Sequence, residues 1–298
     1  MGRMKVRIGV GLGASSAEEF GAAVDRLEER GVDSLWLSEI THGPLVEPFV
    51  GMAHALARTS HLKVGTGVAV LPGRHPVLVA KQLASLAALT PRRVLPVFGL
   101  RPARRDERYL FPVPDGRRAA VFDESLELLR LALREERFDF AGEFFTVSGG
   151  HVGPLPAKPL DIWLGGHAPA ALRRVGRYGD GWLASFLTPA QARVDKEAIE
   201  AAAAAAGREI EDDHYGINIP VSLDGRVPAE LARAARERNP DADPSDLVAD
   251  GWPAARRMIE AHISAGLTKF VVRPAARTPP AGFIDAFARE LMPLQRDI

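Results

Sequence analysis

The feature that most constrains this chain is the alternation of short apolar segments with longer amphipathic ones. Each apolar segment has the length of a buried strand, and each amphipathic segment has the length of a helix. The expected strands are Val6–Val10, Ser34–Leu37, Leu62–Leu71, Arg93–Phe98, Asp161–Leu164, Gly181–Phe186, Tyr215–Val221 and Lys269–Val272. Eight strands, each followed by a helix, predict an α/β fold with a closed (β/α)8 barrel; an open doubly wound sheet is the alternative.

Two local patterns refine this prediction. Ser15 and Ser16 are expected to begin the first helix, because serine side chains cap helix starts. The segment Phe138–Val147 alternates and turns at Ala141-Gly142, which predicts a small hairpin inserted before the fifth strand. We expect residues 1–298 to form a single domain, since α/β barrels often reach this length.

Composition excludes several classes of protein. Lys+Arg and Asp+Glu both number 38 in the 298 residues, so no strong field for nucleic acid is indicated. The absence of cysteine excludes disulfides, thiolate catalysis and Cys-ligated metals. The eight histidines show no spacing typical of a metal site, so no metal is expected.

The sequence also predicts a cytoplasmic protein. No stretch approaches the roughly 18 apolar residues that a membrane helix needs. The start of the chain, Met1–Lys5, leads directly into the first strand without an apolar secretory core. We therefore expect a small-molecule substrate and no nucleic-acid or membrane partner.

In a barrel of this kind the active site lies at the carboxyl ends of the strands. After the fifth strand, Gly165, Gly166 and His167 lead directly into a helix. The free N–H groups and the dipole of that helix start favour a phosphate group, and an ordinary strand-to-helix turn is the alternative. Arg173 and Arg174 lie more than one turn inside the helix and are expected on the surface.

Several segments resemble the luciferase-like monooxygenase superfamily, in particular its coenzyme F420 (deazaflavin) branch. They are Gly65–Lys81, Phe140–Val147, Leu164–Trp182, Asp180–Pro189 and Thr268–Pro274, and they follow the order of the family. The resemblance implies a flavin-like ring near the ends of strands two to four, beside Gly99 and Leu100. It implies the cofactor phosphate at Gly165, Gly166 and His167, and a homodimer.

The resemblance also implies a cis peptide bond at Gly67–Val68, behind the ring. Non-proline cis bonds are rare in proteins, so a trans bond here would count against this ring position.

The implied function is an oxidoreductase that uses F420 for hydride transfer to or from a small organic substrate. The first alternative is a monooxygenase that uses FMN supplied with electrons by a separate reductase. The second is a flavin- or deazaflavin-binding protein without catalysis, because a fold does not fix a function.

Candidate catalytic residues follow the second strand. Relatives often have an acid followed by histidine here, whereas this chain has Glu39 followed by Ile40, and His42 comes two places later. His42 is a candidate proton donor, with a rim histidine as the alternative. Glu39 is expected either to contact the cofactor or substrate or to cap the following loop. His75, at a helix start, is expected to be structural.

Two arginines are candidates for binding the substrate. Arg101 follows the fourth strand and could bind an anionic substrate or the cofactor tail. Arg273 ends the eighth strand and is expected either to point into the cavity or to form an ion pair. Pro96 stands where many relatives have glycine, which makes the end of the fourth strand unusual. Three tryptophans in or beside strands are expected in the core: Trp36, Trp163 and Trp182.

Overall fold

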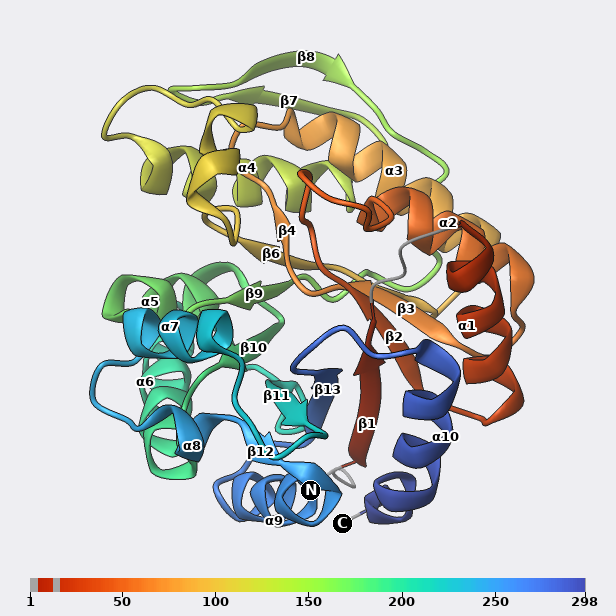
Figure 1. Cartoon of the computed structure of the whole chain (residues 1–298). Helices are drawn as coiled ribbons and strands as arrows, with labels where there is room; N and C mark the ends of the chain where they lie inside the picture. The colour runs from red at the N-terminus through yellow and green to blue at the C-terminus, as the bar shows by residue number, and fades with distance from the viewer. Residues whose placement is uncertain (1–4, 13–16, 298) are drawn as a thin grey trace.

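Parallel strands form the centre of the molecule (Figure 1). The computed structural model describes residues 5–12 and 17–297, so the predicted helix start at Ser15 and Ser16 lies outside the described residues. The strands are β1 (Lys5–Gly11), β2 (Ser34–Leu37), β3 (Lys63–Thr66), β4 (Ala69–Val70), β5 (Val94–Leu95), β6 (Val97–Gly99), β9 (Trp163–Gly165), β10 (Gly181–Ser185), β11 (Tyr215–Ser222) and β13 (Lys269–Pro274).

The sheet closes on itself. Hydrogen-bonded neighbours follow the order β4, β6, β9, β10, β11, β13, β1, β2, β3, β5. Because β3 and β4 are two halves of the third strand, and β5 and β6 two halves of the fourth, this order starts and ends on the same two strands. The predicted closed (β/α)8 barrel is therefore confirmed.

Two of the predicted strands are interrupted. The third, expected to be continuous, breaks at Gly67 and Val68, whose peptide bond is cis. The fourth breaks at Pro96, which has no N–H to donate to the ladder, while its carbonyl still accepts from the Trp163 N–H at 3.0 Å.

Helices surround the barrel (Figure 1). They are α1 (Ala17–Glu29), α2 (Pro48–Arg58), α3 (Pro76–Leu89), α4 (Arg118–Ala132), α5 (Pro169–Tyr178), α6 (Pro189–Ala205), α7 (Ala229–Arg238), α8 (Pro244–Leu247), α9 (Gly251–Ser264) and α10 (Pro280–Glu290). Shorter pieces are η1 (Arg105–Leu110), η2 (Met292–Leu294), β12 (Ala249–Asp250) and β14 (Arg296–Asp297). Within the described ranges, no helix is both long and apolar enough to cross a bilayer.

The predicted hairpin is present as β7 (Phe138–Ala141) and β8 (Thr146–Gly150), an antiparallel pair that precedes β9. Its turn is held from α4, because the carboxylate of Glu124 accepts the backbone N–H groups of Glu143, Phe144 and Phe145. The second strand continues beyond Val147 to Gly150.

The interior of the barrel is filled by a separate apolar cluster. It consists of Trp36, Val97, Trp163, Leu183 and Val271, with Val68 and Leu95 packed against it. The prediction that Trp36, Trp163 and Trp182 are core residues is confirmed, because their exposed fractions are 6%, 8% and 0%. Gly181 gives Trp163 its space: a Cβ there would lie 2.3 Å from the indole.

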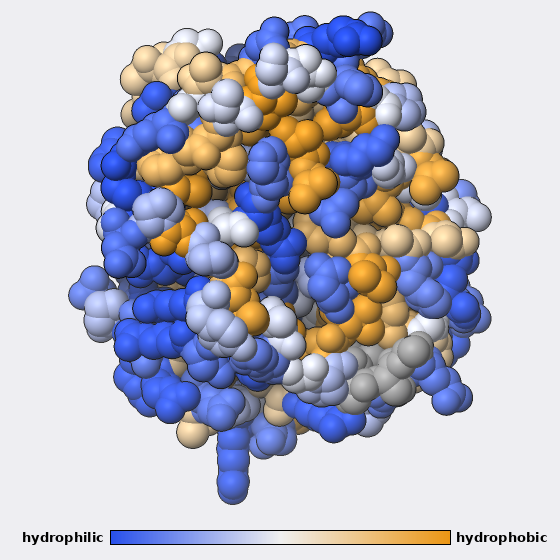
Figure 2. Space-filling view, turned by 90° about the horizontal axis from the view of Figure 1, so that it is seen from above, coloured by the Kyte–Doolittle hydropathy of each residue, from blue (hydrophilic) through white to orange (hydrophobic). Residues whose placement is uncertain are grey.

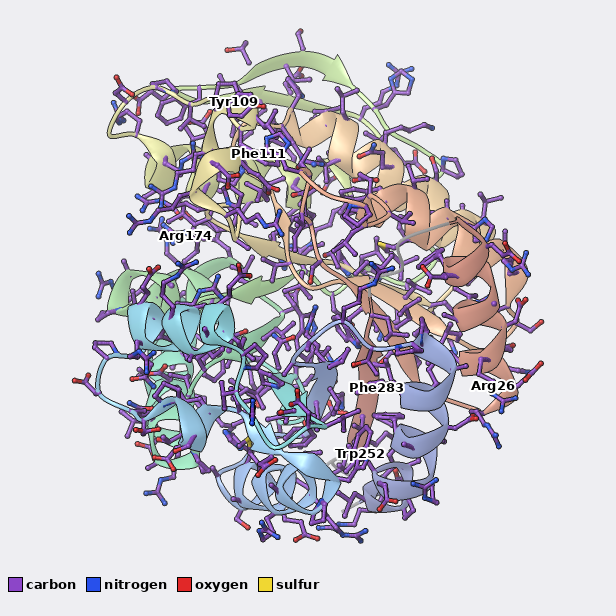
Figure 3. All side chains as sticks on the ribbon, in the orientation of Figure 1. Arg26, Tyr109, Phe111, Arg174, Trp252 and Phe283 are labelled. Carbon is purple, nitrogen blue, oxygen red and sulfur yellow. The ribbon has the colours of Figure 1, made fainter. Side chains whose placement is uncertain are left out.

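The prediction that Arg174 lies on the surface is wrong, whereas Arg173 is exposed as expected. Arg174 is 8% exposed, and its Nε donates to Asp123 of α4 at 2.5 Å. Its guanidinium lies 5.1 Å from the centre of the Phe122 ring. Figure 3 shows Arg174 between α5 and α4. Arginine hydrogen-bonds Asp and stacks on an aromatic ring in the same conformation, so it can be buried between helices.

An ion-pair network holds the amino end of β10. The two carboxylate oxygens of Asp180 accept from both terminal nitrogens of Arg130, at 2.6 and 2.9 Å, and from Arg208 at 2.9 Å. Asp180 also accepts the backbone N–H of Ile162, which links the entry of β9 to that of β10. This end of the barrel is therefore held by charge-assisted hydrogen bonds.

We expect Asp180→Asn to lower the free energy of unfolding by about 2–3 kcal/mol, because it leaves two partly buried guanidinium groups without a carboxylate. Chemical denaturation followed by circular dichroism measures this. Asp285→Asn is the control, since Asp285 pairs with Arg26 and Arg30 nearer the surface, where ion pairs contribute little. Equal losses in the two variants would contradict the assignment.

Candidate active site

The carboxyl ends of the parallel strands meet at one end of the barrel, called the mouth below. Figure 2, seen from above, shows apolar residues gathered between polar ones on the face toward which β1 runs. In folds of this class ligands bind at this end, since the loops that follow the strands lie here. The residues predicted for the site lie after β2, between β3 and β4, at the ends of β6 and β9 and just beyond them, and in β13.

The break in the third strand brings four predicted cofactor residues together. The Gly67–Val68 bond is cis, as the resemblance implied. A Cβ added to Gly99 would lie 2.7 Å from Cγ2 of Val68, and one added to Gly165 would lie 3.3 Å from its Cγ1. Val68 therefore packs between glycines on β6 and β9. Leu100, which follows Gly99, is partly buried against the main core.

Glu39 is a buried carboxylate behind this break. It is 4% exposed, accepts the backbone N–H of Val70 at 2.6 Å, and pairs with Arg74. Burial raises the pKa of Glu39, and the Arg74 charge opposes that shift. Arg74 itself lies between the rings of Phe49 and Phe111, at 5.5 and 5.4 Å. Glu39 thus holds the backbone of β4 in place.

Sequence reasoning missed the role of Arg74. The only signal was its position beside His75 at the start of α3. His75 caps that helix, because its Nδ1 accepts from the Val77 N–H at 3.3 Å; this fits the structural role expected for His75.

His42 is exposed at the mouth and is fixed by the loop that contains η1. Its backbone N–H donates to the buried Glu107 at 2.8 Å, and its carbonyl accepts from Arg104 at 2.5 Å. Its ring Nε2 lies 3.2 Å from the hydroxyl oxygen of Tyr109. These three partners were not predicted, because they lie more than 60 residues away in the sequence. No hydrogen bond or ion pair joins His42 to Glu39 in the described part of the chain.

Gly165, Gly166 and His167 lie between β9 and α5, as predicted. Gly166 has a φ of +112°, a conformation that other residues rarely adopt. Its carbonyl accepts from Nε1 of Trp182 at 2.7 Å. Nε2 of His167 lies 2.7 Å from the carbonyl oxygen of Arg238, at the end of α7. The N-cap of α5 is Ala168, which has no side-chain oxygen to cap the helix. Pro169 has no N–H and the Ala171 N–H donates to the Ala168 carbonyl, so the Ala170 N–H is left to bind an anion.

The two predicted substrate arginines differ in their surroundings. Arg101 is exposed and forms no hydrogen bond or ion pair with any described residue. Arg273 is partly buried and donates to Asn218 at 2.8 Å, to Ser38 at 2.5 Å and to the carbonyl of Gly67 at 2.9 Å. The alternative of an ion pair for Arg273 is wrong, because all three acceptors are neutral.

A cluster of possible metal ligands lies away from the mouth. Glu211, Asp213 and His214 precede β11 and lie close enough together to share an ion. Asp213 already pairs with Lys269 at 3.1 Å, and the Nδ1 of His214 lies 2.8 Å from the carbonyl of Asp180. The cluster thus belongs to the polar network at the amino ends of the strands.

Comparison with known proteins identifies the family. The model of the luciferase-like monooxygenase family matches residues 4–270, so the chain belongs to this family. An uncharacterized protein of Mycobacterium tuberculosis is 41% identical over 140 residues, 47% of this chain. The match spans 48% of that protein, about half its length. An F420-dependent glucose-6-phosphate dehydrogenase of Nocardia farcinica is 28% identical over 95% of this chain and 96% of its own.

Solved structures share the fold. An F420-dependent secondary alcohol dehydrogenase in complex with an F420-acetone adduct has a TM-score of 0.80 and 19% identity, over 97% of this chain and 98% of that one. The oxygenating constituent of 3,6-diketocamphane monooxygenase from Pseudomonas putida, in complex with FMN, has a TM-score of 0.72 and 17% identity, over 97% and 99%.

The Glu39–Arg74 pair generates a pH prediction. The pKa of Glu39 lies above its ordinary value of 4.5 in the folded state, so the folded protein binds this proton more tightly than the unfolded chain does. The contribution of Glu39 to the free energy of unfolding therefore falls as pH rises above 4.5. Because Arg74→Met removes the charge that opposes this shift, we expect its loss of stability to grow between pH 4 and pH 7 by about 2 kcal/mol or more.

Denaturation of the wild type and of Arg74→Met at the two pH values measures this growth. The double variant Glu39→Gln/Arg74→Met has no carboxyl group to titrate at this site. Its loss of stability relative to the wild type should therefore lack the growth between pH 4 and pH 7 that Arg74→Met shows. A loss in Arg74→Met that is the same at both pH values would contradict the assignment.

Proposed function

We propose that this protein is an oxidoreductase that uses coenzyme F420 for hydride transfer to or from a small organic substrate. The observation that carries the proposal is the close packing of Val68 between Gly99 and Gly165, beside the cis Gly67–Val68 bond. The glycines on β6 and β9 leave room for the Val68 side chain, which would form the wall against which a flat ring packs. The family, and the F420-dependent relative that matches 95% of this chain, support the same function.

The residues at the mouth fit such a cofactor. Gly67, Val68, Gly99 and Leu100 would contact the ring. Gly165, Gly166 and His167, at the uncapped start of α5, would hold the phosphate. F420, when bound, supplies hydride transfer at the central carbon of its ring, and the protein supplies orientation and proton transfer.

We assign proton transfer to His42 and a positioning role to Glu39. His42 is exposed at the mouth, and its Nε2 has the Tyr109 hydroxyl as a partner, so its imidazole can exchange protons with solvent or substrate. Glu39 is buried and already engaged by Val70 and Arg74. It therefore holds β4, and through β4 the wall of the ring site, in place.

The second candidate is an FMN-dependent monooxygenase served by a separate reductase, because a neighbour of the same fold binds FMN. The basic loop after β6 favours F420, whose long anionic tail needs a positively charged exit. Arg101, Arg104, Arg105 and Arg108 are all exposed there. The loop also contains the exposed Asp106 and the buried Glu107, so it keeps a net positive charge.

Titration with F420 and with FMN, followed by ring fluorescence, tests the cofactor. We expect saturable F420 binding about tenfold or more tighter than FMN binding. The exposed arginines attract the anionic tail of F420, which FMN lacks. Arg101→Ala/Arg105→Ala should weaken F420 binding and leave FMN binding unchanged. Tight FMN binding with no response to F420 would favour the monooxygenase instead.

The same titration tests the phosphate site. We expect Gly166→Val to weaken the binding of both cofactors about tenfold or more. A residue with a Cβ is strained at this φ and would shift the start of α5. Gly207→Val is the control, since Gly207 also has a positive φ, +66°, but ends α6 in open space. Cofactor binding that survives in Gly166→Val would place the phosphate elsewhere.

A further inference from the structure

Arg273 crosses the mouth of the barrel. It belongs to β13, and a Cβ added to Gly11 of β1 would lie 2.5 Å from its Cγ. A Cβ added to Gly67 would lie 2.5 Å from its Nη2. The side chain therefore runs from β13 over β1 toward the break in the third strand, through space that two glycines leave open.

No negative charge accompanies this guanidinium group. Its acceptors are an amide oxygen, a hydroxyl oxygen and a backbone carbonyl oxygen. Burial lowers the pKa of Arg273 to about 10, and no neighbouring charge contributes to the shift. The group stays protonated at neutral pH, so Arg273 carries a positive charge with no counter-ion among the described residues.

Most other partly buried arginines among the described residues are compensated, but Arg118, which donates to the Phe111 carbonyl, is not. Arg74 and Arg130 pair directly with carboxylates. Arg93, like Arg273, donates to neutral oxygens, but the charge of Glu28 lies close enough to act on it. Burying a cation without an anion is costly. Arg273 shares this lack of a carboxylate with Arg118, and it lies at the end of the barrel where ligands bind in folds of this class.

Arg273 also has donors to spare. A guanidinium group carries five N–H bonds, and the three contacts use one each on Nε, Nη1 and Nη2. One N–H remains on each terminal nitrogen. The Ser38 hydroxyl and the Gly67 carbonyl lie 3.3 Å apart and take the parallel pair, so the two remaining N–H groups point apart. Either one can donate a single charge-assisted hydrogen bond to a carboxylate oxygen.

We propose that Arg273 binds a carboxylate group of the organic substrate, so that this enzyme acts on small carboxylic acids. The proposal rests on the proposed function, which places the substrate at the mouth. The single positive charge of Arg273 matches the single charge of a carboxylate.

Asn218 and Ser38 are positioning residues for this contact. The Nδ2 of Asn218 donates to the carbonyl of Ala184 and to the hydroxyl of Ser185, which turns its Oδ1 toward Nε of Arg273. The Ser38 hydroxyl accepts from Nη1 and donates to the carbonyl of Gly67 at 3.3 Å. The guanidinium plane is thus fixed before a ligand arrives.

Calorimetric titration with two matched pairs of probes tests the proposal: acetate against acetamide, and benzoate against benzamide. Each pair has nearly the same shape and differs in charge. With F420-loaded protein we expect the carboxylates to bind about tenfold or more tighter than the amides, because only a carboxylate brings a negative charge to the hydrogen bond with Arg273. Equal affinity within both pairs would overturn the proposal.

Variants assign the preference to Arg273. Arg273→Met should remove it, while Arg277→Met, an exposed arginine in the loop just after β13, should keep it. Arg273→Lys should restore part of it by returning the charge. If Arg273→Met fails to fold, Arg273→Gln replaces it, because glutamine can still donate a hydrogen bond to a neutral acceptor without carrying charge. A preference that persists in every folded neutral variant would overturn the proposal.

Repeating the titration without F420 separates the two possible sources of the anion. Carboxylates that bind with and without F420 support a substrate site. Carboxylates that bind only without F420, and compete with it, would assign Arg273 to the cofactor and overturn the proposal. Failure of F420 to bind would contradict the proposed function alone, because carboxylate binding by the free protein remains measurable.

Discussion

The hydrogen bond from the Val70 backbone N–H to the buried carboxylate of Glu39 is the contact on which the mouth of the barrel depends. The third strand breaks at Gly67 and Val68, so backbone groups that a regular ladder would satisfy need other partners. The Gly67 N–H donates to the carbonyl of Leu37, and the Gly67 carbonyl accepts from Arg273. The side chains of Glu39, just after β2, and of Arg273, in β13, therefore replace part of the missing ladder. The ring of strands closes despite the break.

This arrangement places charged side chains inside the mouth. Two of them, Arg74 and Arg273, differ in whether a carboxylate balances their charge. Arg74 neutralises Glu39 and is shielded by two aromatic rings, so this pair is structurally complete. Arg273 supports the other side of the break with its charge unmatched. A purely structural role at this position could be filled by a neutral donor. A retained positive charge where ligands bind is better explained by an anionic ligand, because such a ligand offsets the cost of burying the cation.

Much of the fold could be predicted from the sequence, because the strand and helix patterns are local. The Ser34–Leu37 strand was predicted to the residue, and the Gly67–Val68 cis bond followed from family resemblance. The partners of the candidate site residues could not be predicted in this way. Arg74 meets Glu39 only because β2 and the start of α3 converge in space, and the burial of Arg174 depends on the α4–α5 packing. Such contacts depend on tertiary geometry, on which periodicity carries no information.

The loop after β6 shows how one segment can combine two tasks. Glu107 and Arg104 hold the backbone of His42, while Tyr109 contacts its ring; Figure 3 shows Tyr109 and Phe111 on this segment. Phe111 in turn packs on Arg74, the partner of Glu39. The same loop carries the exposed arginines proposed to meet the cofactor tail. Binding of a tail there would therefore act on the segment that positions both His42 and the Arg74 side of the mouth, so the proposed cofactor binding and proton transfer would be physically coupled.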